Sequence, residues 1–237
     1  RSTLFPYTTL FRSRTGGSTG VIVPPAGYLQ TLREICTKHG ILLIFDEVIT
    51  GFGRLGAPFA ADFFGVQPDL ITFAKAVTNG VVPLGGVLVR NDIYESFMTG
   101  PEHAIELFHG YTYSGHPLAM AAGHAALDCL TNDNLIAHAA KLSPVLENIM
   151  HDLRSDELVT DVRNLGLAAA LELKPIPGQP GLRAIQVFEA ALDEGLLVRC
   201  AGETIAVAPP FVASEEELRE MGQGLARALK RANRTAG

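Results

Sequence analysis

Cysteine is scarce in this sequence, and its spacing argues against two kinds of structural site. The three cysteines, Cys36, Cys129 and Cys200, lie far apart and form no CxxC pair. Zinc sites and disulfide frameworks need closely spaced or numerous cysteines, so neither is indicated. Scattered cysteines are typical of the reducing cytosol, and we expect a cytoplasmic location.

A basic patch and a long apolar run are also missing. The chain has 19 lysines and arginines against 25 aspartates and glutamates, and its net charge of −6 disfavours a nucleic-acid-binding surface. No apolar segment approaches the roughly twenty residues that span a bilayer. We therefore expect neither nucleic acid nor a membrane as a partner. At 237 residues and 47% hydrophobic, the chain can form one large globular domain or two smaller ones.

The first fifteen residues do not read as part of a folded domain. They carry basic residues, clustered aromatics and threonines, and lack the apolar core and small-residue cleavage site of a signal peptide. They resemble translated cloning or sequencing-adaptor sequence. We predict that residues 1–15 are foreign or unstructured.

Two charged residues follow short apolar runs and define a candidate site. The run from Ile41 ends in Asp46, and the run from Ile71 ends in Lys75, 29 residues later. That separation is about one strand-helix-strand unit, and strands buried in a parallel sheet present functional groups at their carboxyl ends. We predict that Asp46 and Lys75 lie on neighbouring strand ends. The alternative is that Asp46 caps a helix and Lys75 is a solvated surface lysine.

Strands and helices alternate along the rest of the chain. Before residue 132 we predict strands at 21–23 and 85–89, helices at 27–39, 57–64, 92–97 and 117–130, and a long loop at 98–112. After residue 132 we predict a helix at 135–153 and a second helix that ends at residue 194. We also predict strands at 158–162, 168–173, 196–199 and 204–208, and a final helix capped by Ser214.

Several motifs together resemble the class III aminotransferases, which use pyridoxal phosphate. They are LIFDEVITGFGR at 43–54, PDLITFAKA at 68–76, and HGYTYSGHP at 109–117, which is similar to the omega-amino-acid:pyruvate (beta-alanine:pyruvate) branch. The resemblance implies an α/β chain of fold type I. It implies a partial large cofactor-binding domain at 16–132, with the C-terminal half of a mostly parallel sheet, and a small C-terminal α+β domain at 133–237.

The resemblance also implies a role for each of five residues. Lys75 would be the catalytic Schiff-base lysine and move the substrate proton, and Asp46 would pair with the pyridinium nitrogen. Val48, two residues beyond Asp46 and on the same side of an extended chain, would pack against the cofactor ring. Thr112 would bind the cofactor phosphate of a neighbouring subunit, and Arg199 would bind the substrate carboxylate.

Two other patterns resemble different sites. His103, His109 and His116 are spaced by 6 and 7 residues, which suits neither a helix face nor the usual metal-ligand pairs, so we predict no metal site. The glycines of 51–56 follow GxGxxG, but the strand and acidic residue that a dinucleotide site requires are misplaced. For Glu47 and Arg54 we predict structural roles.

The resemblance covers only part of the family's length. The family's chain is nearly twice as long, and its N-terminal half supplies the phosphate loop, the stacking aromatic and much of the substrate pocket. Three interpretations remain: a C-terminal piece of a transaminase that uses an amino donor and a keto acid as a homodimer or tetramer, another fold type I enzyme such as a decarboxylase or racemase, or a non-catalytic remnant.

Overall fold

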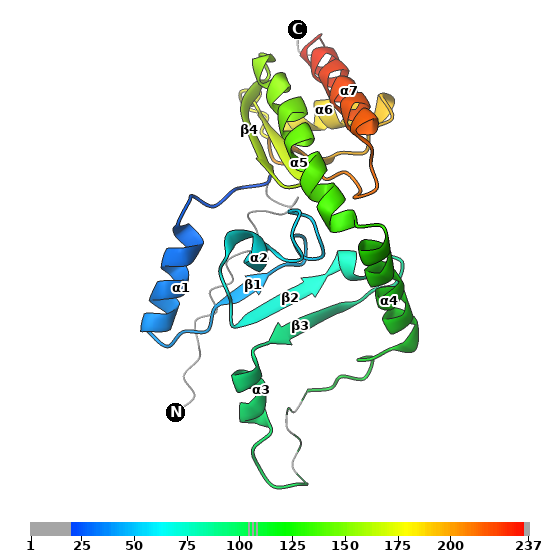
Figure 1. Cartoon of the computed structure of the whole chain (residues 1–237). Helices are drawn as coiled ribbons and strands as arrows, with labels where there is room; N and C mark the ends of the chain where they lie inside the picture. The colour runs from blue at the N-terminus through cyan, green and yellow to red at the C-terminus, as the bar shows by residue number, and fades with distance from the viewer. Residues whose placement is uncertain (1–19, 104, 106, 108, 235–237) are drawn as a thin grey trace.

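The computed structural model describes residues 20–103, 105, 107 and 109–234, and in them two sheets are arranged one above the other (Figure 1). The segment 1–15 lies outside the described residues. The elements with the first sheet are α1 (Tyr28–Lys38), β1 (Ile44–Asp46), α2 (Ala60–Phe64), β2 (Leu70–Ala74), η1 (Lys75–Val77), β3 (Gly85–Val89), α3 (Asn91–Phe97) and α4 (Pro117–Asn132). Those with the second sheet are α5 (Leu135–Asp152), η2 (Leu153–Ser155), β4 (Val159–Leu165), β5 (Ala168–Leu173), α6 (Leu182–Asp193), β6 (Arg199–Ala201), β7 (Thr204–Val207) and α7 (Glu215–Arg234).

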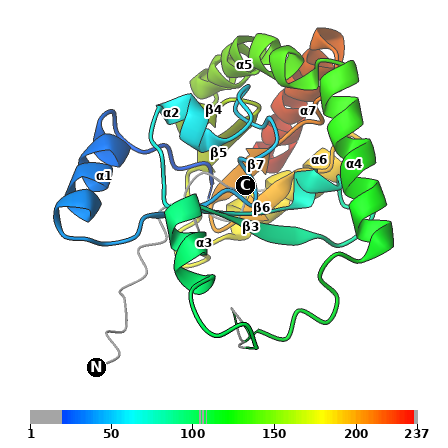
Figure 2. The ribbon, with the colours of Figure 1, turned by 60° about the horizontal axis from the view of Figure 1, so that its bottom comes forward.

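The first sheet has the order β1-β2-β3 and places the strand ends of the candidate site. Strands β1 and β2 run parallel, and Asp46 is paired with Thr72. Strand β3 is antiparallel to β2, which differs from the mostly parallel sheet expected from the sequence. The connection between them holds only the short turn η1, and parallel strands need a longer crossover. Helices α1 and α4 flank opposite ends of this sheet (Figure 2).

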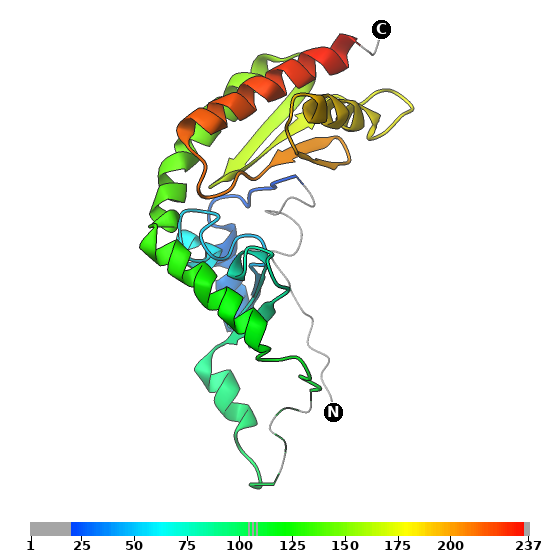
Figure 3. The same ribbon diagram turned by 90° about the vertical axis from the view of Figure 1, so that its right-hand side faces the viewer.

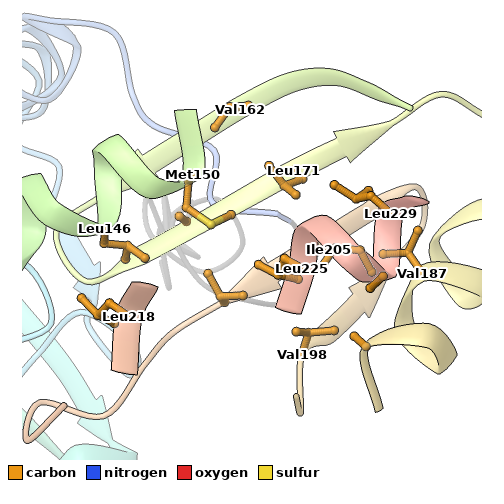
Figure 4. Packing of buried hydrophobic residues seen from close by; sticks show 14 of the residues in the cluster. Leu146, Met150, Val162, Leu171, Val187, Val198, Ile205, Leu218, Leu225 and Leu229 are labelled. Atoms are coloured by element: carbon orange, nitrogen blue, oxygen red, sulfur yellow. The ribbon is translucent and has the colours of Figure 1, made fainter. Parts of the chain in front are cut away.

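The second sheet is antiparallel, with the order β4-β5-β7-β6, and carries the larger core. Helices α5, α6 and α7 pack on it, and their apolar side chains meet those of β5 and β7 in Figure 4. Leu146 and Met150 of α5, Leu171 of β5, Ile205 of β7 and Leu225 of α7 are all buried completely. Burial of one such side chain contributes about 1.5–3 kcal/mol. The cluster therefore strongly stabilises the part of the chain from α5 to α7, residues 135–234, which we call the C-terminal unit.

The final helix begins as the sequence predicts. The Ser214 hydroxyl accepts a hydrogen bond from the Glu217 N–H at 3.2 Å, and the Glu217 carboxylate accepts one from the Ser214 N–H at 2.7 Å. This reciprocal pair is a capping box. The bonds from Ser214 lower the pKa of Glu217, because they favour its charged form.

The strand predicted at 21–23 is absent from the described structure. Val21 has a left-handed backbone (φ 51°) and packs against Ala168, Ala170 and Ala206 of the second sheet. The Arg163 guanidinium donates to the Gly20 carbonyl at 2.8 Å. The start of the described chain is therefore held by the C-terminal unit before α1 joins the first sheet.

Candidate active site

Asp46 and Lys75 lie at the same edge of the first sheet. Asp46 is the last residue of β1 and Lys75 follows the last residue of the neighbouring strand β2. The ladder continues one residue further, because the Glu47 N–H donates to the Thr72 carbonyl at 2.8 Å. Since the two strands are parallel, Asp46 and Lys75 lie at the same edge of the sheet, with Lys75 three residues beyond Thr72, the partner of Asp46.

Lys75 leaves the sheet through an unusual backbone conformation. Its φ of 54° is left-handed, which costs a non-glycine residue about 1–2 kcal/mol. The preceding residue, Ala74, is fully extended, so the chain turns out of the sheet at Lys75 itself. Lys75 is exposed, and no hydrogen bond or ion pair joins its side chain to another described residue.

The Asp46 carboxylate is oriented by the turn that follows it. Its Oδ1 accepts a hydrogen bond from the Val48 N–H at 3.2 Å. The chain already turns at Val48, so the extended geometry predicted for this residue is wrong, although Val48 stays next to the carboxylate. Within the described chain no cation forms an ion pair with Asp46. The acid is therefore fixed in position and without a charged partner.

Glu47 anchors the beginning of the loop after β1. Its side chain is buried and accepts hydrogen bonds from the Ala60 N–H, from the Ala61 N–H at 2.8 Å and from the Thr50 hydroxyl at 3.1 Å. Burial raises the pKa of Glu47, and the three hydrogen bonds oppose that rise without cancelling it. The contacts fit the structural role predicted for this residue.

Arg54 anchors the other end of the same loop to the C-terminal unit. Its guanidinium donates to the carbonyls of Leu167 at 3.0 Å and Pro209 at 2.7 Å, and lies 4.5 Å from the Phe211 ring centroid. Burial lowers the pKa of Arg54 to about 10, so the side chain stays charged at neutral pH. Sequence reasoning predicted a structural role for Arg54 but could not identify these partners, which lie 113 and 155 residues away.

Thr112 lines a cleft beside the β2–β3 connection. The segment 109–116, the β2–β3 connection and helix α4 enclose a volume of about 810 Å³. Phe73, Val77 and Met120 contribute apolar walls, whereas Asp46, Lys75 and Arg199 do not line it. The structure therefore places Asp46 and Lys75 at one edge of the first sheet, and Thr112 in a cleft that neither of them lines.

Arg199 belongs to the second sheet. It was predicted to end a strand at 196–199, but it opens β6, where it pairs with Ala206 of β7. The apolar run before it is not in a strand, and Leu197 is 86% exposed. The Arg199 side chain is exposed and makes no ion pair with a described residue.

The patterns that imitate other sites have packing explanations. A Cβ on Gly56 would lie 2.7 Å from the Ala140 Cα, so the glycine loop is required by its close approach to α5. The His109 ring packs on Tyr111, with 4.3 Å between centroids. Among the residues that the structure describes, no three histidine, cysteine or acidic side chains form a group that could hold a metal ion.

No helix in the described part of the chain has the length and apolar character needed to cross a membrane.

This arrangement matches a known family. The class III aminotransferases match residues 15–229, and the chain belongs to that family. An omega-aminotransferase of Caulobacter vibrioides is 55% identical over 213 residues, which are 90% of this chain and 48% of that protein. A beta-alanine:pyruvate aminotransferase of Pseudomonas aeruginosa is 51% identical over 215 residues, with the same two coverages. The chain thus spans about half the length of the curated relatives that it matches.

Solved structures agree with the fold. An (S)-enantioselective omega-transaminase from Thermomicrobium roseum superposes with a TM-score of 0.86 at 37% identity, over 93% of this chain and 50% of that one. The predicted family, fold type I architecture and pyridoxal phosphate cofactor are confirmed. The residues present fit that cofactor, because an amine and an oriented carboxylate, neither of which forms an ion pair with a described residue, stand at one sheet edge.

Proposed function

We propose that this chain is the C-terminal piece of an aminotransferase that moves an amino group from an omega-amino acid or amine to pyruvate or another keto acid. The parallel pairing of β1 and β2 supports the proposal most directly, since the strands that lead to Asp46 and Lys75 end at one edge of the sheet. The names of the Caulobacter and Pseudomonas relatives support this substrate class.

In this proposal each side chain at the sheet edge has one task. When bound, pyridoxal phosphate supplies an electron sink for the substrate carbon. The Lys75 Nζ would bind the cofactor covalently and then move the proton at the substrate carbon, which its exposure permits. The Asp46 carboxylate would keep the pyridine nitrogen protonated, and Val48 would pack against the ring.

Two further residues would complete the site from outside the sheet edge. Thr112 would donate its hydroxyl to the cofactor phosphate of a second subunit, which suits its place in a cleft that excludes Lys75. The whole enzyme would then be a homodimer or a tetramer. Arg199 would hold a substrate carboxylate through two parallel hydrogen bonds, and no described residue forms an ion pair with its side chain that would compete.

The proposal includes a division of the chain. Residues 16–132 would form part of the large cofactor-binding domain and residues 133–237 the small domain, and the separate sheets support this boundary. The three cysteines are free, which supports a cytoplasmic location.

A chimera tests the proposal. We would express the first half of the Caulobacter relative followed by residues 17–237, add pyridoxal phosphate, reduce with borohydride and map the peptides. The label is expected on Lys75, with alanine formed from pyruvate and beta-alanine. A Lys75→Arg variant should lose both, and the control Lys38→Ala, at an exposed lysine on α1, should lose neither. Labelling of a different lysine in the folded chimera would reject the assignment.

A further inference from the structure

The loop from Glu47 to Gly56 is fixed at both ends. It begins directly after Asp46, and Glu47 ties it to the first residues of α2. Arg54 ties it to the C-terminal unit. Asp46, the candidate acid, therefore directly precedes a loop that is hydrogen-bonded to α2 at one end and to the C-terminal unit at the other.

Arg54 makes a reciprocal contact with the β4–β5 turn. Its guanidinium donates to the Leu167 carbonyl, and its own carbonyl accepts from the Leu167 N–H at 2.9 Å. The same guanidinium reaches the Pro209 carbonyl, in the segment after β7. One side chain thus joins the loop to two separate connections of the C-terminal unit.

The β4–β5 turn and the loop approach each other closely at Gly166. A Cβ on Gly166 would lie 2.5 Å from the Arg54 carbonyl oxygen and 2.5 Å from the Leu55 Cα. Gly166 also has a left-handed φ of 56°, so a larger residue would be both crowded and strained. The close approach therefore requires a glycine at position 166.

The charge of Arg54 is held without a carboxylate partner among the described residues. Two carbonyl dipoles and the face of the Phe211 ring stabilise it instead. Both carbonyls accept from one nitrogen, Nη1, and the planar guanidinium lies over the Phe211 ring. A lysine ammonium can donate to a carbonyl but has no plane that stacks on that ring. The contact therefore depends on a guanidinium group at this position.

We infer that Arg54 is a positioning residue. It joins the loop after Asp46 to the C-terminal unit through its bonds to Leu167 and Pro209, a contact that we call the clasp. Together with Glu47, it holds Asp46 in place. Its importance for catalysis rests on the proposed function of Asp46. The clasp itself is a property of the chain without cofactor and can be measured separately.

Amide hydrogen exchange on the 237-residue chain, without cofactor, tests the clasp. Arg54→Ala should speed exchange at the Leu167 amide and at the Gly51 and Phe52 amides together, by roughly ten- to a hundredfold. Exchange in the core of β5, at Leu171, should stay unchanged. The control Arg163→Ala also removes a guanidinium that donates to a carbonyl, but this residue does not contact the loop. It should leave Gly51 and Phe52 unaffected.

Chemical rescue separates positioning from general damage. Ethylguanidinium added to Arg54→Ala should restore slow exchange at both places, because it can donate to the two carbonyls and stack on the Phe211 ring, whereas ethylammonium has no plane to stack and should not. Acceleration confined to one side, rescue by both ions or by neither, or a wild-type chain without protection at these amides would overturn the inference. None of these results bears on labelling of Lys75, so failure of the clasp and failure of the proposed function remain distinguishable.

Discussion

Substitution of Glu47 should destabilise the loop after Asp46 by an amount that the structure lets us estimate. Glu47→Ala would leave the buried Ala60 N–H and Thr50 hydroxyl without an acceptor, whereas the Ala61 N–H is only half-buried and can reach water. At about 1–3 kcal/mol for each of the two buried donors, the expected loss is roughly 2–6 kcal/mol. Glu47→Gln keeps one acceptor oxygen and should lose less.

The loss should depend on pH in a direction set by burial. Burial raises the pKa of Glu47, so between the ordinary and the raised value the folded chain keeps a proton that the unfolded chain has released. The contribution of this carboxyl is therefore full below the ordinary value and declines as pH rises through the raised pKa. Since glutamine does not titrate, the stability gap between wild type and Glu47→Gln should be largest in mild acid.

Exchange of the Ala60 and Ala61 amides measures this gap directly, because Glu47 accepts from both. We would record the free energy of opening at several pH values, corrected for intrinsic exchange, with the exposed Glu34→Gln on α1 as the control. A gap that widens toward neutral pH would mean that the three hydrogen bonds outweigh desolvation, and the reasoning would be refuted.

Three predictions concern the proposed enzyme. In the chimera, Lys75→Ala should abolish transamination and leave the circular dichroism spectrum unchanged, because an exposed lysine at a strand end contributes little packing; loss of the spectrum would point to a structural lysine. Arg199→Ala should reduce kcat/KM for pyruvate and beta-alanine by a factor equivalent to about 2–4 kcal/mol, and reduce it much less for amines without a carboxylate; equal losses would contradict carboxylate binding. The 237-residue chain alone should neither transaminate nor retain pyridoxal phosphate after gel filtration, because the proposed enzyme needs the half that this chain does not span; a stoichiometric retained cofactor would contradict this.

Much of the fold was predictable because the spacing of apolar residues along the chain indicates most of its helices and strands. The helix predicted at 135–153 is observed at Leu135–Asp152, and the strand predicted at 168–173 has those bounds in the structure. Asp46 and Lys75 were proposed as site residues for a similar reason, since each ends a short apolar run. The parallel pairing of the two strands puts both residues at one sheet edge, as predicted, and their roles stay a prediction.

Non-local contacts explain what the sequence did not reveal. The run Leu196-Leu197-Val198 has strand character, yet strand β6 starts at Arg199 because its register is set by pairing with Ala206. Val21 also has strand propensity, but it is held on the second sheet by residues more than a hundred positions away. The partners of Arg54 are equally distant, and no spacing rule connects them.

The distribution of buried side chains shows why the clasp should matter to the site. The C-terminal unit carries the larger core, in which α5 and α7 run side by side along the second sheet (Figure 3). The first sheet has a much smaller cluster, and Val87, Leu88 and Val89 of its outer strand β3 are 54%, 47% and 41% exposed. A sheet with few buried contacts opens more readily than its neighbour. Arg54 connects the loop beside Asp46 to the better-packed unit, so the geometry of the candidate acid depends on stability that the first sheet does not itself provide.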